Sequence, residues 1–323
     1  MLAPAPAGSL RGRHLLAVSD LSASELDLVL AAARRLKHSR SVEQLGLLRG
    51  KTLGMLFEKP SLRTRVSFEV AMTQLGGHAL YATASDFLMG ARETPEDAAR
   101  VLSRFVDAIV VRTHEHEPLE RFAAAATVPV INALSARSHP CQGIADLLTV
   151  RERFGSVPGL SIAFVGDARN NVAASLGEAA MLCGASIRFG APPSHQPDEA
   201  FLQHLRRLGR ARGATARTFT SASRAVANAD AVYTDVWTSM GEEAMSERNA
   251  AALIPYRVTP ALMNHAAPHA IFLHCLPAHR GDEVVADVID GPRSAVFDQA
   301  ENRLHAQKAL LLALLTDLRG IAA

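Results

Sequence analysis

The chain of 323 residues is long enough for two domains, since a domain commonly holds about 100–200 residues. Hydrophobic residues make up 48% of it and charged residues 20%, a globular composition that excludes a disordered or fibrous protein. A formal net charge of +2 gives no reason to expect nucleic acid or a membrane as partner. Any anion-binding site must therefore be formed by a small cluster of basic side chains rather than by the charge of the whole protein.

The three cysteines predict no covalent framework. Cys141, Cys183 and Cys275 are widely spaced and form no CxxC pair, so neither disulfides nor a zinc site is indicated, and a reducing compartment fits best. Arginines interrupt the first residues where a signal peptide needs an apolar run. The apolar run at 309–315 is too short to cross a bilayer and predicts the buried face of a closing helix. We expect a soluble protein.

Short apolar runs alternate with helical patterns along the chain. In the first half we expect strands at 51–58, 78–83, 107–113 and 129–134, with helices ending at 75, spanning 97–105 and starting at 142. In the second half we expect strands at 161–167, 186–191, 231–237 and 271–277. This alternation predicts an α/β fold with two doubly wound domains, each a mainly parallel sheet flanked by helices.

Gly, Ser and Pro interrupt the pattern at 155–159 and mark the expected domain boundary. We assign 1–155 to the first domain and 156–302 to the second. The closing helix, at about 303–323, is expected to pack back on the first domain.

The segment FEKPSLRTR combines an extended run with a helix start. Ser61 is a suitable N-cap, and Leu62 and Val66 share one face of the expected helix. Arg63 and the hydroxyls of Ser61 and Thr64, together with the free N–H groups of the helix start, suit a bound phosphate. The plainer interpretation is a cap with solvated arginines. No Walker A spacing is present, so ATP chemistry does not follow.

The segment SHPCQGIADLLT places His139 and Gln142 beside a helix start that follows an expected strand. Strand carboxyl ends are where α/β sheets bind ligands. His139 could donate a hydrogen bond to a carbonyl oxygen that gains charge, and Gln142 could orient an amide-like group. Arg112, at the end of another strand, is a third donor. A lone histidine is nevertheless more often structural.

Three later segments also follow strands. GDARNNVAASL has only Gly166 and lacks the GxGxxG spacing, so an amide such as Asn171 suits an amino-acid head group better than a dinucleotide. Asp235 offers a carboxylate to an ammonium group, and TSMG supplies a loop. Cys275 alone reads best as a small buried residue.

Arg303 starts the closing helix and, alone, reads as a surface arginine. The run HEHE at 114–117 could imitate metal ligands, but no further ligand set joins it. We predict no metal and no cofactor.

Taken together, these segments resemble the aspartate and ornithine carbamoyltransferase family, and its ornithine branch in particular, over about 15–315. The ordered motifs are FEKPSLRTR, HPCQ, DVWTSMG, HCLPAHRGDEV and AENRLH. Motif matching implies that carbamoyl phosphate is held by Ser61, Leu62, Arg63, Thr64, Arg112, His139, Gln142, Cys275, Leu276 and Arg303. It implies that ornithine is held by Asn171, Asp235, Ser239 and Met240. The catalytic set would be Arg112, His139, Asp235 and Cys275.

The resemblance further implies a first domain that binds carbamoyl phosphate, a second that binds ornithine, and a cytoplasmic homotrimer without metal. The expected reaction is attack by the neutral side-chain amine of ornithine on the carbonyl carbon, with loss of phosphate, in arginine biosynthesis. Asp235, Cys275 or the substrate phosphate could take the proton from the amine. Two positions depart from the family pattern: Leu62 replaces a frequent Thr, and Leu88 replaces a Gln that reaches a neighbouring subunit.

Three alternatives stay open. The nearest is a carbamoyltransferase with another acceptor, such as putrescine, N-acetylornithine or aspartate. A nicotinamide-dependent dehydrogenase of the same architecture is disfavoured by the missing glycine fingerprint. A non-catalytic paralogue is disfavoured because the polar positions that the chemistry needs are present.

Overall fold

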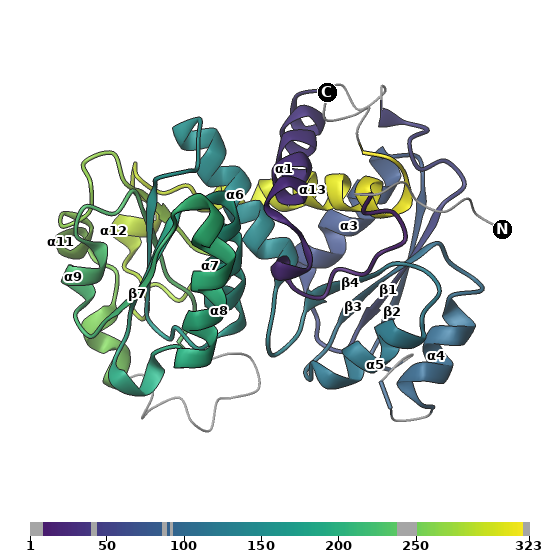
Figure 1. The fold of residues 1–323 in the computed structure, drawn as a ribbon, viewed down its shortest axis with the longest axis horizontal. Helices are drawn as coiled ribbons and strands as arrows, with labels where there is room; N and C mark the ends of the chain where they lie inside the picture. Colours follow the sequence, from purple (N-terminus) through teal and green to yellow (C-terminus); the bar gives the residue numbers. More distant parts are fainter. Residues whose placement is uncertain (1–8, 40–43, 86–88, 91–92, 238–250, 319–323) are drawn as a thin grey trace. The chain divides into compact units, whose positions relative to one another are not determined.

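The chain forms two compact units in this computed structural model, which describes residues 9–39, 44–85, 89–90, 93–237 and 251–318 (Figure 1). The first unit comprises Met1–Leu148 together with Asn302–Ala323. The second comprises Thr149–Glu301. The closing segment of the chain therefore belongs with its beginning, and each unit is described by itself below.

The first unit contains a four-stranded parallel sheet in the order β2-β1-β3-β4. Its strands are β1 Thr52–Phe57, β2 His78–Thr83, β3 Ala108–Arg112 and β4 Val130–Leu134. The register pairs Phe57 with both Thr83 and Arg112. The carboxyl ends of these strands thus meet at one edge of the sheet.

Helices cover both faces of this sheet (Figure 1). The helical elements are η1 Val18–Asp20, α1 Ala23–His38, α3 Leu62–Gln74, α4 Pro95–Leu102, α5 Glu117–Ala125, the start of α6 Pro140–Phe154 and most of α13 Val296–Leu315. On the face of α4 and α5, Ile109 and Val111 pack in one cluster with Phe122. The other face carries α1, α3 and α13, and Lys37 of α1 donates to Asn302 of α13 at 2.8 Å.

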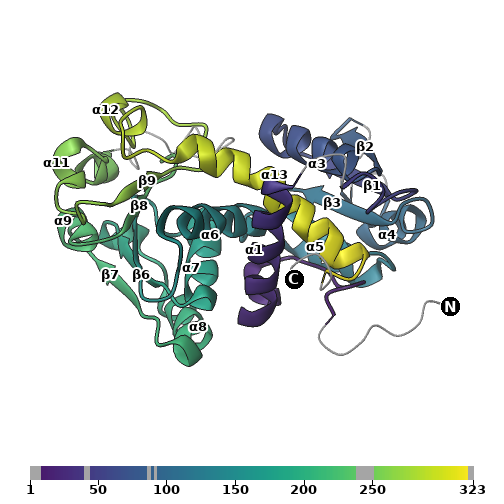
Figure 2. The same ribbon diagram turned by 90° about the horizontal axis from the view of Figure 1, so that it is seen from above.

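The second unit contains a five-stranded parallel sheet in the order β7-β6-β5-β8-β9. Its strands are β5 Ser161–Val165, β6 Ser186–Gly190, β7 Ala216–Phe219, β8 Ala231–Tyr233 and β9 Ile271–Leu273. Its helical elements include α7 Asn171–Cys183, η2 Pro193–His195, α8 Glu199–Gly209, η3 Arg210–Arg212, α9 Ala222–Val226, η5 Ile254–Tyr256, α11 Pro260–Met263 and α12 Ala286–Ile289. Figure 2 shows α7 and α8 on one face of the sheet and α9, α11 and α12 on the other.

Close packing in the second unit depends on one glycine of α7. A Cβ atom on Gly177 would lie 3.1 Å from Leu205 of α8 and 3.3 Å from Phe189 of β6. Glycine therefore lets α7 approach both neighbours, as expected for a well-packed interior.

The predicted fold class, two parallel α/β units flanked by helices, is confirmed. Two details differ. The strand β7 was not predicted, because its residues are mostly exposed and carry little apolar signal. The face of α3 that Leu62 and Val66 share is not its buried one: Leu62 is 77% and Val66 46% exposed, while Phe68 and Met72 face the core. The closing helix also begins earlier than expected, at Val296.

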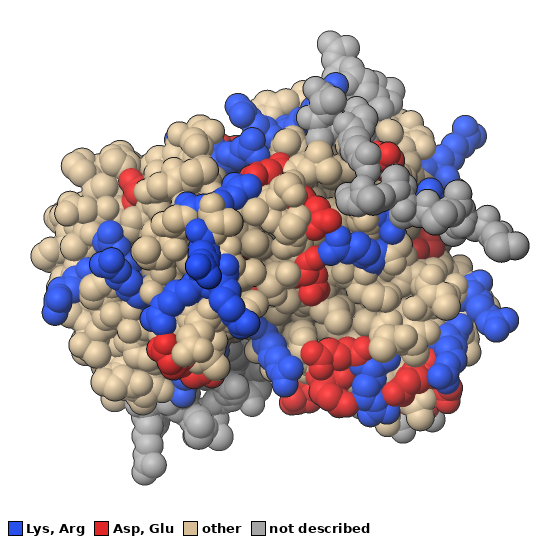
Figure 3. All heavy atoms as spheres, in the orientation of Figure 1, with Lys and Arg blue, Asp and Glu red and all other residues tan. Residues whose placement is uncertain are grey.

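Charges on the surface are mixed. Figure 3 shows acidic and basic side chains intermingled over α4 and α5, where Arg121 pairs with Glu96 and Arg100 with Asp97. Within the ranges described above, no helix has the length and apolar character needed to cross a membrane.

Candidate active site

The carboxyl edge of the first sheet gathers most of the residues predicted to bind phosphate. Arg112 is the last residue of β3. Ser61 is the N-cap of α3, a few residues after β1, and His139 directly precedes α6, which follows β4. Parallel strands end together, so two helix N-termini lie at this edge, and their N–H groups favour anions.

Arg303 of α13 is the centre of the hydrogen bonds in this cluster. One guanidinium nitrogen donates to Thr64 Oγ1 at 2.7 Å, and another donates to Gln142 Oε1 at 3.1 Å. Gln142 Nε2 in turn donates to Asp146 Oδ1 at 2.8 Å. Arg303 is buried, so it is not the surface residue that its position alone suggested. These bonds align α13 with the starts of α3 and α6.

His139 is buried and lies among positive charges. Burial lowers the pKa of its imidazole well below the ordinary value, and the charges of Arg303, Arg112 and Arg63 lower it further. The ring is therefore neutral at pH 7 and can offer one N–H without adding charge. The combined positive charge of these three guanidinium groups would stabilise an anion with two charges.

Ser61 takes the predicted N-cap position but makes a different bond. Its hydroxyl donates to Thr64 Oγ1 at 2.9 Å, and its side chain forms no capping bond with the helix backbone. The N–H groups of this first turn therefore do not donate to the Ser61 side chain. Arg63, the second residue of α3, is half-buried. Leu62 points to solvent.

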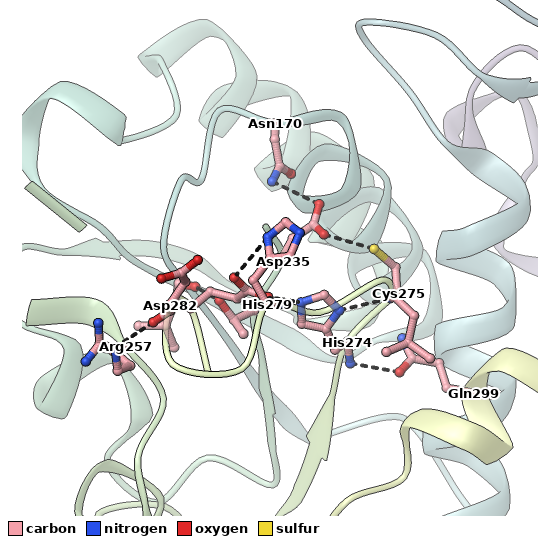
Figure 4. Close-up of polar contacts among 12 residues, drawn as sticks. Asn170, Asp235, Arg257, His274, Cys275, His279, Asp282 and Gln299 are labelled. Carbon is pink, nitrogen blue, oxygen red and sulfur yellow. Dashed lines mark hydrogen bonds and ion pairs between the residues drawn. The ribbon is translucent and has the colours of Figure 1, made fainter. Parts of the chain in front are cut away.

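The second unit has its own cluster of polar side chains at the carboxyl ends of β8 and β9 (Figure 4). Asp235, two residues after β8, is buried, and Cys275, two residues after β9, is half-buried. Cys275 Sγ donates to Asp235 Oδ1 at 3.0 Å. Asn170, the N-cap of α7, accepts from Ala173 N and donates to Asp235 Oδ2 at 3.3 Å. A carboxylate is thus held between a thiol and an amide.

Asn170, the residue before the predicted Asn171, donates to Asp235. Sequence reasoning chose Asn171, which is the first residue of α7 and is half-buried. The signal for Asn170 was its N-cap position, since a capping side chain is fixed at the end of the turn. Ser239, Met240 and Leu88 lie outside the described residues.

Two groups of described residues could supply metal ligands. They are Asp235 with His274 and Cys275, and His279 with Asp282 and Glu283; within each group the ligand atoms lie within 4.8 Å of one another. Hydrogen bonds join Cys275 to Asp235, and His274 to Glu283. The prediction that no metal is required stays a prediction.

A parallel α/β fold with a basic cluster at helix starts defines a protein that binds a phosphorylated ligand. Two family models match the chain: the carbamoyl-P binding domain of aspartate/ornithine carbamoyltransferase over residues 13–152, and the Asp/Orn binding domain over residues 158–314. The chain belongs to the aspartate/ornithine carbamoyltransferase family.

Individual relatives are similar to this chain over nearly its full length. The anabolic ornithine carbamoyltransferase of Pyrococcus furiosus is 49% identical over 304 residues, which is 94% of this chain and 96% of the relative. The solved structure of the P. furiosus enzyme has a TM-score of 0.92 at 48% identity and covers 95% of this chain and 98% of its own. The solved structure of the Thermus thermophilus ornithine carbamoyltransferase has a TM-score of 0.84 at 44% identity, and the match covers 94% of this chain and 99% of the T. thermophilus chain.

Proposed function

We propose that this protein transfers the carbamoyl group of carbamoyl phosphate to the side-chain amine of L-ornithine, giving L-citrulline and phosphate in arginine biosynthesis. The observation that carries the proposal is the basic cluster of the first unit, in which the charges of Arg63, Arg112 and Arg303 act on a buried, neutral His139. Relatives at 48–49% identity bear the name ornithine carbamoyltransferase, and one is called anabolic.

Carbamoyl phosphate binds at this cluster. Guanidinium groups form paired hydrogen bonds with phosphate oxygens, and the start of α3 adds N–H donors and the positive end of the helix dipole. Gln142 is held by Arg303 and Asp146, so it is oriented to contact the carbamoyl group. We assign to the same ligand Ser61, Leu62, Arg63, Thr64, Arg112, His139, Gln142, Arg303 and the backbone of Cys275 and Leu276.

Ornithine binds in the second unit through Asp235, together with Asn171, Ser239 and Met240. The carboxylate of Asp235 already accepts hydrogen bonds from Cys275 and Asn170, so its position is fixed before ligand binds. A fixed, buried carboxylate suits the α-ammonium group of an amino acid.

The chemistry needs no nucleophile from the protein. The neutral amine of ornithine attacks the carbonyl carbon, a tetrahedral intermediate forms, and the bond to phosphate breaks. His139 and Arg112 donate to the oxygen that becomes negative, and the arginines stabilise the departing phosphate. His139 acts as a donor without exchanging its proton, because its lowered pKa keeps the ring neutral.

Citrulline formation tests the assignment, with ornithine, putrescine, aspartate and N-acetylornithine compared side by side. Ornithine should be the best acceptor. N-acetylornithine should be at least about 30-fold poorer in kcat/KM, because loss of the ammonium leaves a buried carboxylate unpaired, an effect on the order of 2–5 kcal/mol. Equal use of N-acetylornithine would assign the site to another acceptor.

The active assembly is proposed to be a cytoplasmic homotrimer. Exposed apolar side chains of α3 and the edge strand β2 support an interface, since Leu62 is 77% and Leu80 51% exposed. Arg65 lies 4.0 Å over the Tyr81 ring and joins these two elements. Full specific activity in a dilute sample that is monomeric by light scattering would refute the trimer.

A further inference from the structure

A fully buried histidine follows β9 and is not part of the predicted site. His274 Nδ1 lies 2.9 Å from the backbone N of Leu276, and its Nε2 lies 3.2 Å from Glu283 Oε1. The backbone N of His274 donates to Gln299 Oε1 at 2.9 Å (Figure 4). Both ring nitrogens and the main chain are therefore engaged.

These contacts define the tautomer of the ring. The N–H of Leu276 can only donate, so Nδ1 of His274 must accept and carries no proton. The ring is then neutral with its proton on Nε2, which donates to Glu283. Glu283 Oε1 also accepts from His279 N at 2.6 Å, so the carboxylate is fixed from a second side. A second proton on His274 would break the bond to Leu276.

Leu276 needs such support. Its φ of +58° lies in the left-handed region, which a bulky side chain adopts only at a cost in free energy. A backbone of this kind persists where neighbouring groups over-determine it. The bond from Leu276 N to His274 spans two residues and closes a small ring around Cys275.

We propose that His274 is a positioning residue: held in one tautomer by Glu283, it fixes the Leu276 backbone and so holds Cys275 against Asp235. Cys275 lies between the two bonded residues, and its Sγ meets Asp235 Oδ1 at 3.0 Å. The inference rests on the proposed function, in which Asp235 binds the acceptor. A misplacement of about 1 Å at such a carboxylate is enough to impair catalysis strongly.

His274 does not itself transfer a proton to substrate. Its side chain has no exposed surface, and both nitrogens are used inside the protein. The same holds for Glu283, whose side chain is also fully buried. Their effect on the reaction passes through Leu276 and Cys275.

Two substitutions separate the two contacts of the ring. The amide of His274→Asn lies at the level of Nδ1 and can accept from Leu276, but it is too short to reach Glu283. The amide of His274→Gln reaches the level of Nε2 and Glu283 but leaves Leu276 N without its acceptor. Both variants lose packing, so a merely structural role predicts that activity follows stability in both.

We expect His274→Gln to lower kcat/KM for ornithine at least about tenfold, and His274→Asn to recover at least about fivefold relative to it. Thermal unfolding of the purified full-length protein is measured beside the kinetics. His269→Gln is the matched control, because His269 is exposed and pairs with Asp230 of the same unit. Equal kinetics for the Asn and Gln variants, or activity that simply follows the melting temperature, would overturn the proposal.

If neither variant folds, ¹⁵N NMR of histidine-labelled wild-type protein decides the matter. One imidazole should carry its proton on Nε2 and accept a hydrogen bond at Nδ1, and Glu283→Gln should change its shifts. A His274 ring with a proton on Nδ1 contradicts the inference. Wild-type protein that forms no citrulline would instead refute the proposed function, so the two failures are distinguishable.

Discussion

The two polar clusters of the molecule differ in charge and in the way they are assembled. The first unit gathers guanidinium groups from β3, α3 and α13 around His139. The second unit fixes the carboxylate of Asp235 with a thiol and an amide from neighbouring turns. The first therefore suits a phosphate and the second an ammonium group. The comparison shows how one architecture, used twice, can bind opposite charges at equivalent strand ends.

The largest effect is expected at Arg303. Arg303→Ala removes a buried cation and two hydrogen bonds, to Thr64 and Gln142. We expect kcat/KM for carbamoyl phosphate to fall about 100-fold or more, which corresponds to roughly 2.7 kcal/mol. Steady-state kinetics measure this loss, and Arg303→Lys, which keeps the charge, should recover part of it. A wild-type KM for carbamoyl phosphate in the alanine variant would separate Arg303 from the phosphate site.

Asp235→Asn tests the second cluster. The substitution keeps the shape and removes the charge, so kcat/KM for ornithine should fall at least about 30-fold, or roughly 2 kcal/mol. The dissociation constant for carbamoyl phosphate, measured calorimetrically without acceptor, should change less than about twofold. Weakened carbamoyl phosphate binding with intact ornithine kinetics would reverse the roles of the two clusters.

Arg63→Ala should have a smaller effect than Arg303→Ala, because Arg63 is only half-buried and water can partly replace it. We expect KM for carbamoyl phosphate to rise about tenfold, since a guanidinium donor to phosphate is lost while alanine suits the helix. Arg100→Ala, an exposed arginine paired with Asp97 in α4, is the control and should leave KM unchanged. Equal kinetics for the two variants would exclude Arg63 from the site.

Acid should affect the two units in different pH ranges. Burial lowers the pKa of His139, His116 and His14 below 6.5, so the unfolded chain binds protons that the native first unit excludes. Stability should thus fall as the pH drops below about 6.5, by at most about 1.4 kcal/mol per pH unit for each histidine.

Glu283 in the second unit acts in the same direction but in a lower pH range, because its pKa is also lowered on folding. Burial raises the pKa of its carboxyl, but hydrogen bonds from His274 and His279 outweigh this and hold the pKa below 4.5. Its contribution to stability is present above pH 4.5 and is lost below it. Urea unfolding from about pH 3 to 8 measures both ranges. His139→Gln should reduce the slope of the upper range without removing it, since His116 and His14 remain, and should leave the lower range unchanged. An unchanged upper slope would contradict the buried neutral imidazole.

Local patterns in the sequence predicted much of this arrangement. The strands of both sheets, except β7, and the starts of α3 and α6 follow from short-range periodicity and turn residues, which also placed Ser61 and His139 at strand ends. Contacts that depend on tertiary packing were not predictable. Nothing near Arg303 in the sequence indicates Thr64, and the partnership of His274 with Glu283 appears only when the turn after β9 is folded.

The position of α13 has a consequence for biosynthesis on the ribosome. Arg303 and the buried residues 309–315 complete the core and the basic cluster of a unit whose other residues end at Leu148. More than 150 residues are translated between these two points, which takes on the order of 10–30 seconds at usual elongation rates. During that interval the sheet face that carries α1 and α3 lacks α13, and the cluster lacks its central cation. The first unit, whose residues up to Leu148 leave the ribosome first, therefore reaches its final structure only after the second unit has been translated.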